Sequence, residues 1–222
     1  MTRFFDILFS GLAILVLFPF MLPVIIGLKL TGEHDIFYLQ ERIGKGGKTF
    51  KVFKFATMLR NSPSMAGGLI TLDKDPRILP MGNFLRKTKI NEIPQLINIF
   101  IGNMSVIGYR PFVKEHYDLY SSEVKTEINK IVPGLSGIGS VVFRDEEDIL
   151  HTVENPNNFH DNIITPYKGQ LECWYVNHRS VANYFKLIFA TVIAVLDSKS
   201  NIWQKWFKDL PPVPENLKGY IG

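Results

Sequence analysis

The segment from Ile7 to Leu28 constrains this chain more than any other, because it contains no charged side chain: ILFSGLAILVLFPFMLPVIIGL. A straight α-helix of that length measures roughly 33 Å, which is enough to cross the hydrocarbon core of a bilayer. Pro19 and Pro23 lie within the segment, and each proline removes a backbone donor and clashes with the preceding helical turn. The segment therefore predicts a membrane anchor that is interrupted at the two prolines.

The charges that flank this segment bear on its orientation. Arg3 precedes it, and four basic residues follow it: Lys29, Arg42, Lys45 and Lys48. Positive charge on both sides gives no clear direction for a crossing. A helix–break–helix that enters and leaves the bilayer by one face explains both the prolines and the charges. A single crossing helix with a proline kink is the alternative, and a cleaved signal peptide fits less well because no small-x-small site follows a short apolar core.

The composition narrows the class of protein. The 222 residues fit one sizeable domain plus an appendage, and 46% of them are hydrophobic. A net charge of only +4 does not indicate a nucleic-acid-binding protein and fits a protein at an anionic membrane surface. The single Cys173 excludes an internal disulfide and a cysteine-based zinc cluster. The five histidines show no metal-ligand spacing, so we interpret them as structural.

Periodicity and turn residues divide the chain into three parts: a membrane anchor over residues 1–31, a main domain over 32–200 and a C-terminal segment over 201–222. We expect an α-rich α/β fold with one small β-hairpin over Phe37–Phe55 and amphipathic helices at the membrane interface. Trp203, Trp206 and Phe207 alternate with lysines, which is typical of an aromatic belt at a membrane surface. The expected helices are 80–87, 91–101, 114–131, a segment within 171–176, and 181–196, with a strand or loop over 135–143.

The stretch from Arg77 to Phe112 contains the charged residues that best suit binding of a ligand or metal. Basic residues precede the pair Asn91-Glu92, and Arg110 returns after the apolar helix. Pro94 fits only the first turn of a helix, so we expect that helix to start near Asn91, with Glu92 at its positive end. Such an arrangement suits a diphosphate and a divalent metal; a capped surface helix with solvated charges is the alternative. The acidic run 144–148 fits a solvated helix start better than a metal site.

Four motifs together resemble one family. QERIGKGGKTFKVFKFATM, DPRILPMGNFLRKTKINEIPQLINIFIGNMSVIGYRP, VPGLSGIGS and LECWYVNHRS occur in the order seen in bacterial sugar transferases of the monotopic phosphoglycosyl transferase family. The resemblance runs from Arg3 to about Leu196. It implies a re-entrant anchor, with the catalytic domain on the cytoplasmic face of the bacterial inner membrane. Members transfer a sugar-1-phosphate from a UDP-sugar to polyprenyl (undecaprenyl) phosphate, release UMP and use Mg²⁺, as the first membrane step of a glycoconjugate or polysaccharide pathway.

The resemblance also assigns roles to particular residues. The family pattern is Asp-Glu followed by an apolar residue and Pro-Gln-Leu, where the Asp is the nucleophile and the Glu helps to hold the metal. Glu92 matches the family Glu, and Asn91 stands where the nucleophilic Asp is expected. Glu172 and Tyr184 each stand where another Asp is usual. Five residues match basic or phosphate-side positions of the family: Lys54, Arg77, Arg86, Arg110 and Pro111. Arg144 is one further candidate for phosphate binding.

Asn91 leaves three accounts of function open, because an amide is a poor nucleophile. The lipid phosphate attacks the UDP-sugar directly, or Glu92 becomes the nucleophile, or the protein is a non-catalytic relative that binds UDP-sugar or assembly partners at the membrane. Without the resemblance, a peripheral membrane-binding protein with no chemistry is a further alternative. The sequence identifies neither the sugar nor the pathway, and it leaves a homodimer open as the oligomeric state.

Overall fold

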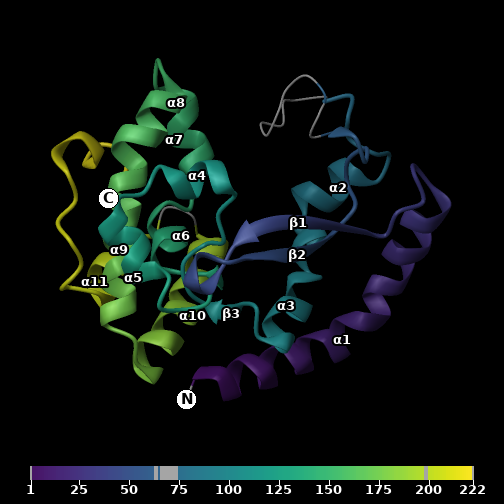
Figure 1. The fold of residues 1–222 in the computed structure, drawn as a ribbon, viewed down its shortest axis with the longest axis horizontal. Helices are drawn as coiled ribbons and strands as arrows, with labels where there is room; N and C mark the ends of the chain where they lie inside the picture. The colour runs from purple at the N-terminus through teal and green to yellow at the C-terminus, as the bar shows by residue number, and fades with distance from the viewer. Residues whose placement is uncertain (1, 63–64, 66–74, 198–199, 222) are drawn as a thin grey trace. The chain divides into compact units, whose positions relative to one another are not determined.

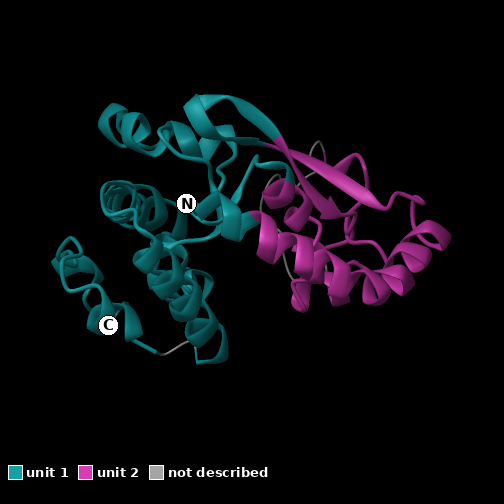
Figure 2. Cartoon of the chain, turned by 90° about the horizontal axis from the view of Figure 1, so that it is seen from below, with its two compact units in different colours: residues 1–6, 42–50, 101–222 teal, residues 7–41, 51–100 magenta. Residues whose placement is uncertain are grey.

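The computed structural model describes residues 2–62, 65, 75–197 and 200–221, and it is rich in helix with two small sheets (Figure 1). It divides into two compact units (Figure 2). Unit 1 comprises Met1–Asp6, Arg42–Phe50 and Ile101–Gly222, and unit 2 comprises Ile7–Glu41 and Lys51–Phe100. The helix α1 and the strands β1 and β2 each have residues in both units.

The elements up to β3 are α1 (Thr2–Leu30), β1 (Phe37–Ile43), η1 (Lys45–Gly47), β2 (Thr49–Phe55), α2 (Gly82–Lys87), η3 (Ile90–Glu92), α3 (Gln95–Ile101) and β3 (Ser105–Ile107). Those that follow are α4 (Lys114–Asp118), α5 (Ser122–Ile128), β4 (Gly134–Ser136), α6 (Ile138–Val142), α7 (Glu146–Thr152), α8 (Pro156–Phe159), η4 (His160–Ile164), α9 (Thr165–Asn177), α10 (Val181–Leu196), α11 (Ile202–Trp206) and η5 (Glu215–Leu217).

The helix α1 contains both Pro19 and Pro23 and is not divided by a loop. The predicted break is instead a bend, because Figure 1 draws α1 as one element that changes direction along its length. Prolines within a helix remove backbone hydrogen bonds and bend it in this way. Within the described part of the chain, α1 is the helix that is long and apolar enough to cross a membrane.

One face of α1 packs in the core of unit 2. Met21, Val24 and Leu28 are buried there together with Phe55 of β2 and Leu85 of α2. Many other large apolar side chains of the helix are exposed, including Leu12, Leu15, Val16, Phe20, Ile26 and Leu30. Exposed apolar surface of this extent on one helix indicates a membrane protein, since water would disfavour it.

The first turns of α1 belong to unit 1, where Asp6 is buried. Its carboxylate accepts hydrogen bonds from Ser105 Oγ at 2.9 Å, from the Val106 N–H at 2.9 Å and from Tyr184 OH at 2.8 Å. One buried side chain of α1 therefore satisfies donors from β3 and α10 at once. Tyr184 therefore bonds to Asp6, and nothing in the sequence pattern indicated that these two residues meet.

We expect Asp6→Ala to destabilise the protein by about 3 kcal/mol, because three buried donors would lose their acceptor. Tyr184→Phe removes one of these donors and serves as the graded control, with an expected loss of about 1 kcal/mol. Chemical unfolding in detergent, followed by tryptophan fluorescence, measures both. A loss below about 0.5 kcal/mol for Asp6→Ala, the range of ordinary surface substitutions, would contradict this assignment.

The predicted hairpin is confirmed. β1 and β2 form a two-stranded sheet, and the Gly44 N–H donates to the Lys48 carbonyl at 2.8 Å to close the turn. Gly46 and Gly47 have φ values of 70° and 71°, the left-handed region that the glycine cluster predicted. The helix over 181–196 is also confirmed as α10.

Three other expectations were wrong in detail. The helix expected over 114–131 is two helices, because Leu119–Ser121 turns and Ser121 Oγ accepts from the Val124 N–H to cap α5. Segment 135–143 is mostly the short helix α6, and Gly134–Ser136 pairs in parallel with β3. The helix expected from Asn91 is a 3₁₀ turn, η3, and α3 starts at Gln95.

The aromatic residues near the C-terminus do not form the predicted surface belt. Trp203 and Phe207 are buried in unit 1, and Phe207 packs edge-on against Trp174 of α9 with ring centroids 5.6 Å apart. Beyond them, the Tyr167 hydroxyl donates to the Pro211 carbonyl at 3.0 Å. The C-terminal segment therefore completes the core of unit 1.

Candidate functional site

The candidate site begins with a cation and a carboxylate of unit 2. Lys54 Nζ, near the end of β2, lies 3.5 Å from Glu92 Oε1 in η3. Neither side chain is fully buried: 18% of Lys54 and 26% of Glu92 is exposed. An ion pair with this access can exchange partners with an incoming anion or cation, so the predicted Glu92 and the predicted Lys54 form one site.

Asn91 lies next to Glu92 and is buried, in contrast to its neighbour. Its side-chain carbonyl oxygen, Oδ1, has no hydrogen-bond partner among the described residues. A buried polar atom without a partner is costly, and such atoms are often satisfied by a bound ion, water or ligand. The structure therefore places an unsatisfied amide oxygen beside the Lys54–Glu92 pair.

The backbone around this pair is held by two features. Lys89, just before η3, has φ 59°, which is uncommon for a residue with a side chain. Asn98 of α3 is fully buried and bonds β2 on both of its side-chain atoms: Nδ2 donates to the Lys51 carbonyl at 2.8 Å, and Oδ1 accepts from the Phe53 N–H at 2.9 Å. Because Phe53 precedes Lys54, Asn98 fixes the strand that carries the site lysine. Sequence reasoning missed Asn98, whose spacing resembles that of an ordinary helix residue.

Two other predicted residues of unit 2 have different positions. Arg86 in α2 is half-buried, and its Nη1 donates to Met58 Sδ at 3.5 Å. Arg77 is buried, with 2% exposed, and its guanidinium binds Asp75 at 2.6 to 3.1 Å and the Ser62 carbonyl at 3.2 Å. Arg77 therefore holds its own loop together, and this placement does not support the phosphate contact that the sequence predicted.

The remaining predicted residues belong to unit 1. Arg110 and Arg144 are exposed. Pro111 is buried, and its carbonyl accepts from Arg42 Nη1 at 3.1 Å. The Ile43 N–H also donates to the Phe112 carbonyl at 2.8 Å, so the end of β1 fixes the backbone that follows Arg110. Arg110 is thus an exposed cation on a well-held segment.

One carboxylate of the acidic run after Arg144, that of Glu146, is paired within the protein. Glu146 starts α7 and binds Lys168 Nζ at 2.5 Å, and its other oxygen lies 3.7 Å from His160 Nε2. His160 Nδ1 lies 2.7 Å from Asp161 Oδ1 and its ring is 5.2 Å from that of His116. Across the residues that the structure describes, no group of three or more His, Cys, Asp or Glu side chains could hold a metal. The helix α7 begins at Glu146, within the run, which agrees with the predicted helix start.

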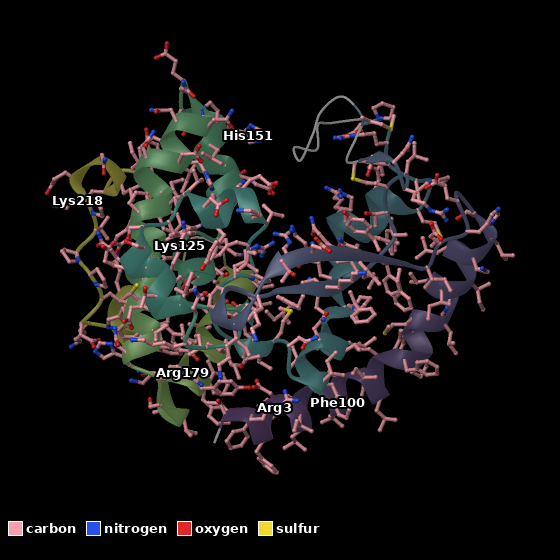
Figure 3. The ribbon with its side chains drawn as sticks, viewed as in Figure 1. Arg3, Phe100, Lys125, His151, Arg179 and Lys218 are labelled. Carbon is pink, nitrogen blue, oxygen red and sulfur yellow. The ribbon has the colours of Figure 1, made fainter. Side chains whose placement is uncertain are left out.

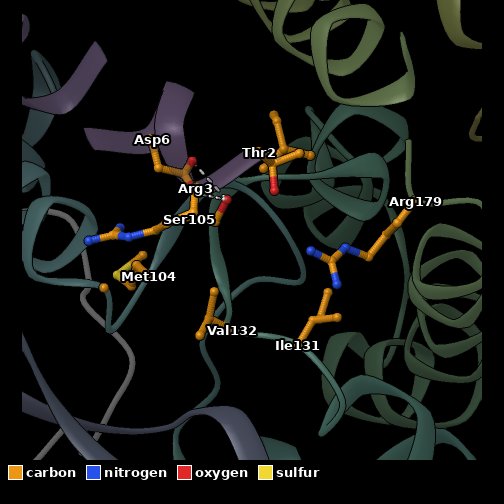
Figure 4. A pocket seen from close by; sticks show the side chains of 10 residues that line it. Thr2, Arg3, Asp6, Met104, Ser105, Ile131, Val132 and Arg179 are labelled. Atoms are coloured by element: carbon orange, nitrogen blue, oxygen red, sulfur yellow. Dashed lines mark hydrogen bonds between the residues drawn. The ribbon is translucent and has the colours of Figure 1, made fainter. Parts of the chain in front are cut away.

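Unit 1 also contains a small cavity of about 130 Å³ at the start of α1 (Figure 4). Arg3 and Arg179 both line it, and their side chains are labelled in Figure 3. The Asp6 carboxylate forms part of its wall and is already bonded to Ser105. None of the residues predicted to act on phosphate lines this cavity, so it is separate from the candidate site.

The comparisons with known proteins agree with the predicted resemblance. The family model described as bacterial sugar transferase matches residues 1–198. An uncharacterized sugar transferase of Haemophilus influenzae is 32% identical over 211 residues, covering 89% of this chain and 41% of that protein. The exopolysaccharide production protein ExoY of Sinorhizobium fredii is 35% identical over 158 residues, covering 65% of this chain and 70% of ExoY.

A third relative carries a more specific name. The UDP-glucose:undecaprenyl-phosphate glucose-1-phosphate transferase of Escherichia coli is 30% identical over 192 residues, covering 84% of this chain and 38% of that enzyme. This chain therefore spans about two fifths of the length of the Haemophilus influenzae and Escherichia coli relatives.

Proposed function

Because the chain belongs to the bacterial sugar transferase family, we propose that it transfers a sugar-1-phosphate from a UDP-sugar to polyprenyl phosphate and releases UMP. The observation that carries this proposal is the Lys54–Glu92 pair at 3.5 Å beside the unsatisfied Asn91 oxygen. Phosphoryl transfer requires cations and oxygen ligands around the transferring group rather than much covalent chemistry. The named Escherichia coli relative acts on UDP-glucose and undecaprenyl phosphate, which supports this substrate class.

We propose Mg²⁺ as the metal, and the donors at the site fit it. Mg²⁺ prefers oxygen ligands and is commonly bound by one or two protein groups plus water and substrate phosphates. The Glu92 carboxylate and the unpartnered Asn91 Oδ1 are two such oxygens, adjacent in sequence. When bound, the ion would neutralise charge that develops on the phosphates. Lys54 would contact a phosphate oxygen of the substrate.

For the chemical step we propose direct transfer. An oxygen of the lipid phosphate attacks the β-phosphorus of the UDP-sugar, and the bond from that phosphorus to the bridging oxygen breaks. UMP leaves with that oxygen, and the sugar stays on the transferred phosphate, so the lipid product is a diphosphate-linked sugar. Asn91 has no ionisable oxygen to act as nucleophile, and Glu92 is already engaged with Lys54. Arg110 and Arg144 are the exposed cations of unit 1 that we propose for phosphate contact.

We propose that α1 is re-entrant and that the catalytic domain lies on the cytoplasmic face of the inner membrane. The exposed apolar side chains of α1 suit contact with acyl chains, and basic residues flank the helix on both sides. A polyprenyl phosphate has its tail in the bilayer and its phosphate at the surface. An anchor that returns to the same surface would keep the Lys54–Glu92 site within reach of that phosphate.

The proposal is tested by assaying purified protein in nanodiscs for UMP release from a panel of UDP-sugars with undecaprenyl phosphate. We expect UMP only when lipid phosphate and Mg²⁺ are both present. Binding of lipid with no UMP from any UDP-sugar would instead identify a non-catalytic relative, the candidate that the amide at position 91 favours.

A further inference from the structure

A buried carboxyl group of unit 1 lies outside every contact described so far. Glu172 projects from α9 and is 3% exposed. Its Oε2 atom has no hydrogen-bond partner among the described residues, and its carboxyl accepts from the Gly139 N–H in α6. A Cβ atom at position 139 would lie 2.4 Å from Glu172 Oε1, so only glycine leaves room for this contact. Glu172 is therefore packed directly against the backbone of the Gly-rich segment.

That Gly-rich segment is bonded in turn to the chain that carries Arg110. The Gly108 N–H donates to the Ser136 carbonyl at 2.9 Å, and the Gly134 N–H donates to the Tyr109 carbonyl at 2.7 Å. A Cβ atom at position 137 would lie 2.0 Å from the Gly108 carbonyl oxygen. The two backbones are therefore in contact, and a shift at Gly139 would move Gly108 and Tyr109 with it.

Tyr109 connects Glu172 to this chain a second time. Its hydroxyl is buried and has no partner among the described residues, and its ring stacks on Phe112 with centroids 5.9 Å apart. Burial raises the pKa of Tyr109, and the charges of Tyr117 and Glu172 raise it further. Two buried polar side chains with unused hydrogen-bonding capacity thus adjoin this backbone: Tyr109 within the segment from Gly108 to Arg110, and Glu172 against the Gly-rich segment bonded to it.

We infer that Glu172 is a positioning residue that fixes the Gly108–Arg110 segment and so sets the place of the Arg110 guanidinium. This inference rests on the proposed function, in which Arg110 contacts phosphate. A neutral carboxyl accepts the Gly139 N–H on one oxygen and holds a proton on the other. An ionised carboxylate at the same place would accept this N–H more strongly, but it would be a buried charge, which costs stability.

The surroundings of Glu172 favour the neutral form. Burial raises its pKa from an ordinary 4.5 to about 8, and Lys168 and the Gly139 N–H oppose that shift. The titratable groups that also sense its charge are Tyr109, Tyr120, Cys173 and Tyr175, and Glu172 raises the pKa of each. Lys168 Nζ binds Glu146 at 2.5 Å, so it is less available to stabilise a negative charge on Glu172.

The first test is a double-mutant cycle on UMP release with Glu172→Ala, Arg110→Gln and the double variant. We expect Glu172→Ala to lower kcat/KM by about 10- to 100-fold, mainly through KM for the UDP-sugar, because Arg110 is misplaced. The double variant should be no worse than Arg110→Gln alone. Additive losses would overturn the inference. Glu172→Gln keeps the shape of the neutral carboxyl and should restore kcat/KM to within about threefold of wild type.

The second test needs no turnover. Hydrogen exchange without substrate should be faster at the Gly108 and Gly134 amides in Glu172→Ala than in wild type, and unchanged in Glu172→Gln. Unchanged exchange in Glu172→Ala would overturn the inference even if the protein is an active transferase. Faster exchange in a protein that releases no UMP would support the positioning contact while the proposed function fails.

The pH dependence of stability gives a third readout. The folded state binds the Glu172 proton more tightly than the unfolded state does, so this contribution is full below pH 4.5 and is lost as pH rises through about 8. Wild type should therefore lose stability between about pH 5 and pH 9, and Glu172→Gln should lose less. The matched control is Glu154→Gln at an exposed glutamate, which should keep the wild-type slope. Equal slopes in Glu172→Gln and wild type would contradict the neutral form.

Discussion

Replacing Glu92 by Gln is expected to reduce UMP release by about 10²- to 10³-fold. The substitution removes the negative charge that pairs with Lys54 at 3.5 Å and the carboxylate oxygen that we propose as a Mg²⁺ ligand. It keeps the size of the side chain, so η3 should fold as before. The loss should appear in kcat as well as in KM, because charge neutralisation acts on the transferring phosphate. Initial rates of UMP release at several Mg²⁺ concentrations measure it.

Two controls make the Glu92 result specific. Glu154→Gln removes one charge from an exposed glutamate and should leave the rate unchanged. Higher Mg²⁺ should recover part of the activity of Glu92→Gln if the residue acts through the ion. A Glu92→Gln variant that turns over at the wild-type rate would show that the chemistry takes place elsewhere.

Replacing Asn91 by Asp is expected to create a half-reaction that the wild-type protein lacks. An aspartate next to Glu92 supplies an ionisable oxygen, so the variant should release UMP from a UDP-sugar without lipid phosphate. Release should stop after about one UMP per protein, because the sugar phosphate remains bound to Asp, and intact mass spectrometry should detect the adduct. Wild type should show neither the burst nor the adduct.

The matched control for this variant is Asn83→Asp, which introduces the same charge at an exposed position of α2. It should give no burst. A burst from wild type without lipid phosphate would contradict direct transfer. Full transfer by Asn91→Asp together with no transfer by wild type would show that the amide at position 91 disables the enzyme.

The parts of the fold that sequence predicted are those set by local chemistry. The charge-free run predicted α1, the glycine cluster predicted the turn between β1 and β2, and the strongly apolar run over 181–196 predicted α10. The parallel pairing of β3 with β4 was not predicted, because Ser105 and Gly134 are far apart in sequence and each strand is too short to show alternation. Contacts between buried residues that are far apart in sequence cannot be recognised from hydrophobic periodicity.

The same limit applies to the site. The motifs named Glu92 and Lys54 separately as site residues, and the structure shows that the two side chains lie 3.5 Å apart. Arg77 was predicted to bind phosphate, but its neighbour Asp75 binds it in a buried loop, and a charge pattern cannot distinguish the two outcomes. Pro94 indicated a helix start near Asn91, but the chain first forms the 3₁₀ turn that buries Asn91. Glu172 gave no local signal of its burial.

The most direct test of the central claim is identification of the lipid product. Protein in nanodiscs is incubated with a UDP-sugar, undecaprenyl phosphate and Mg²⁺, and the extracted lipid is analysed by mass spectrometry. The account predicts a lipid whose mass has increased by one sugar phosphate, in amounts equal to the UMP released and greatly reduced in Glu92→Gln. UMP without that lipid, or the same lipid yield from Glu92→Gln, would contradict it.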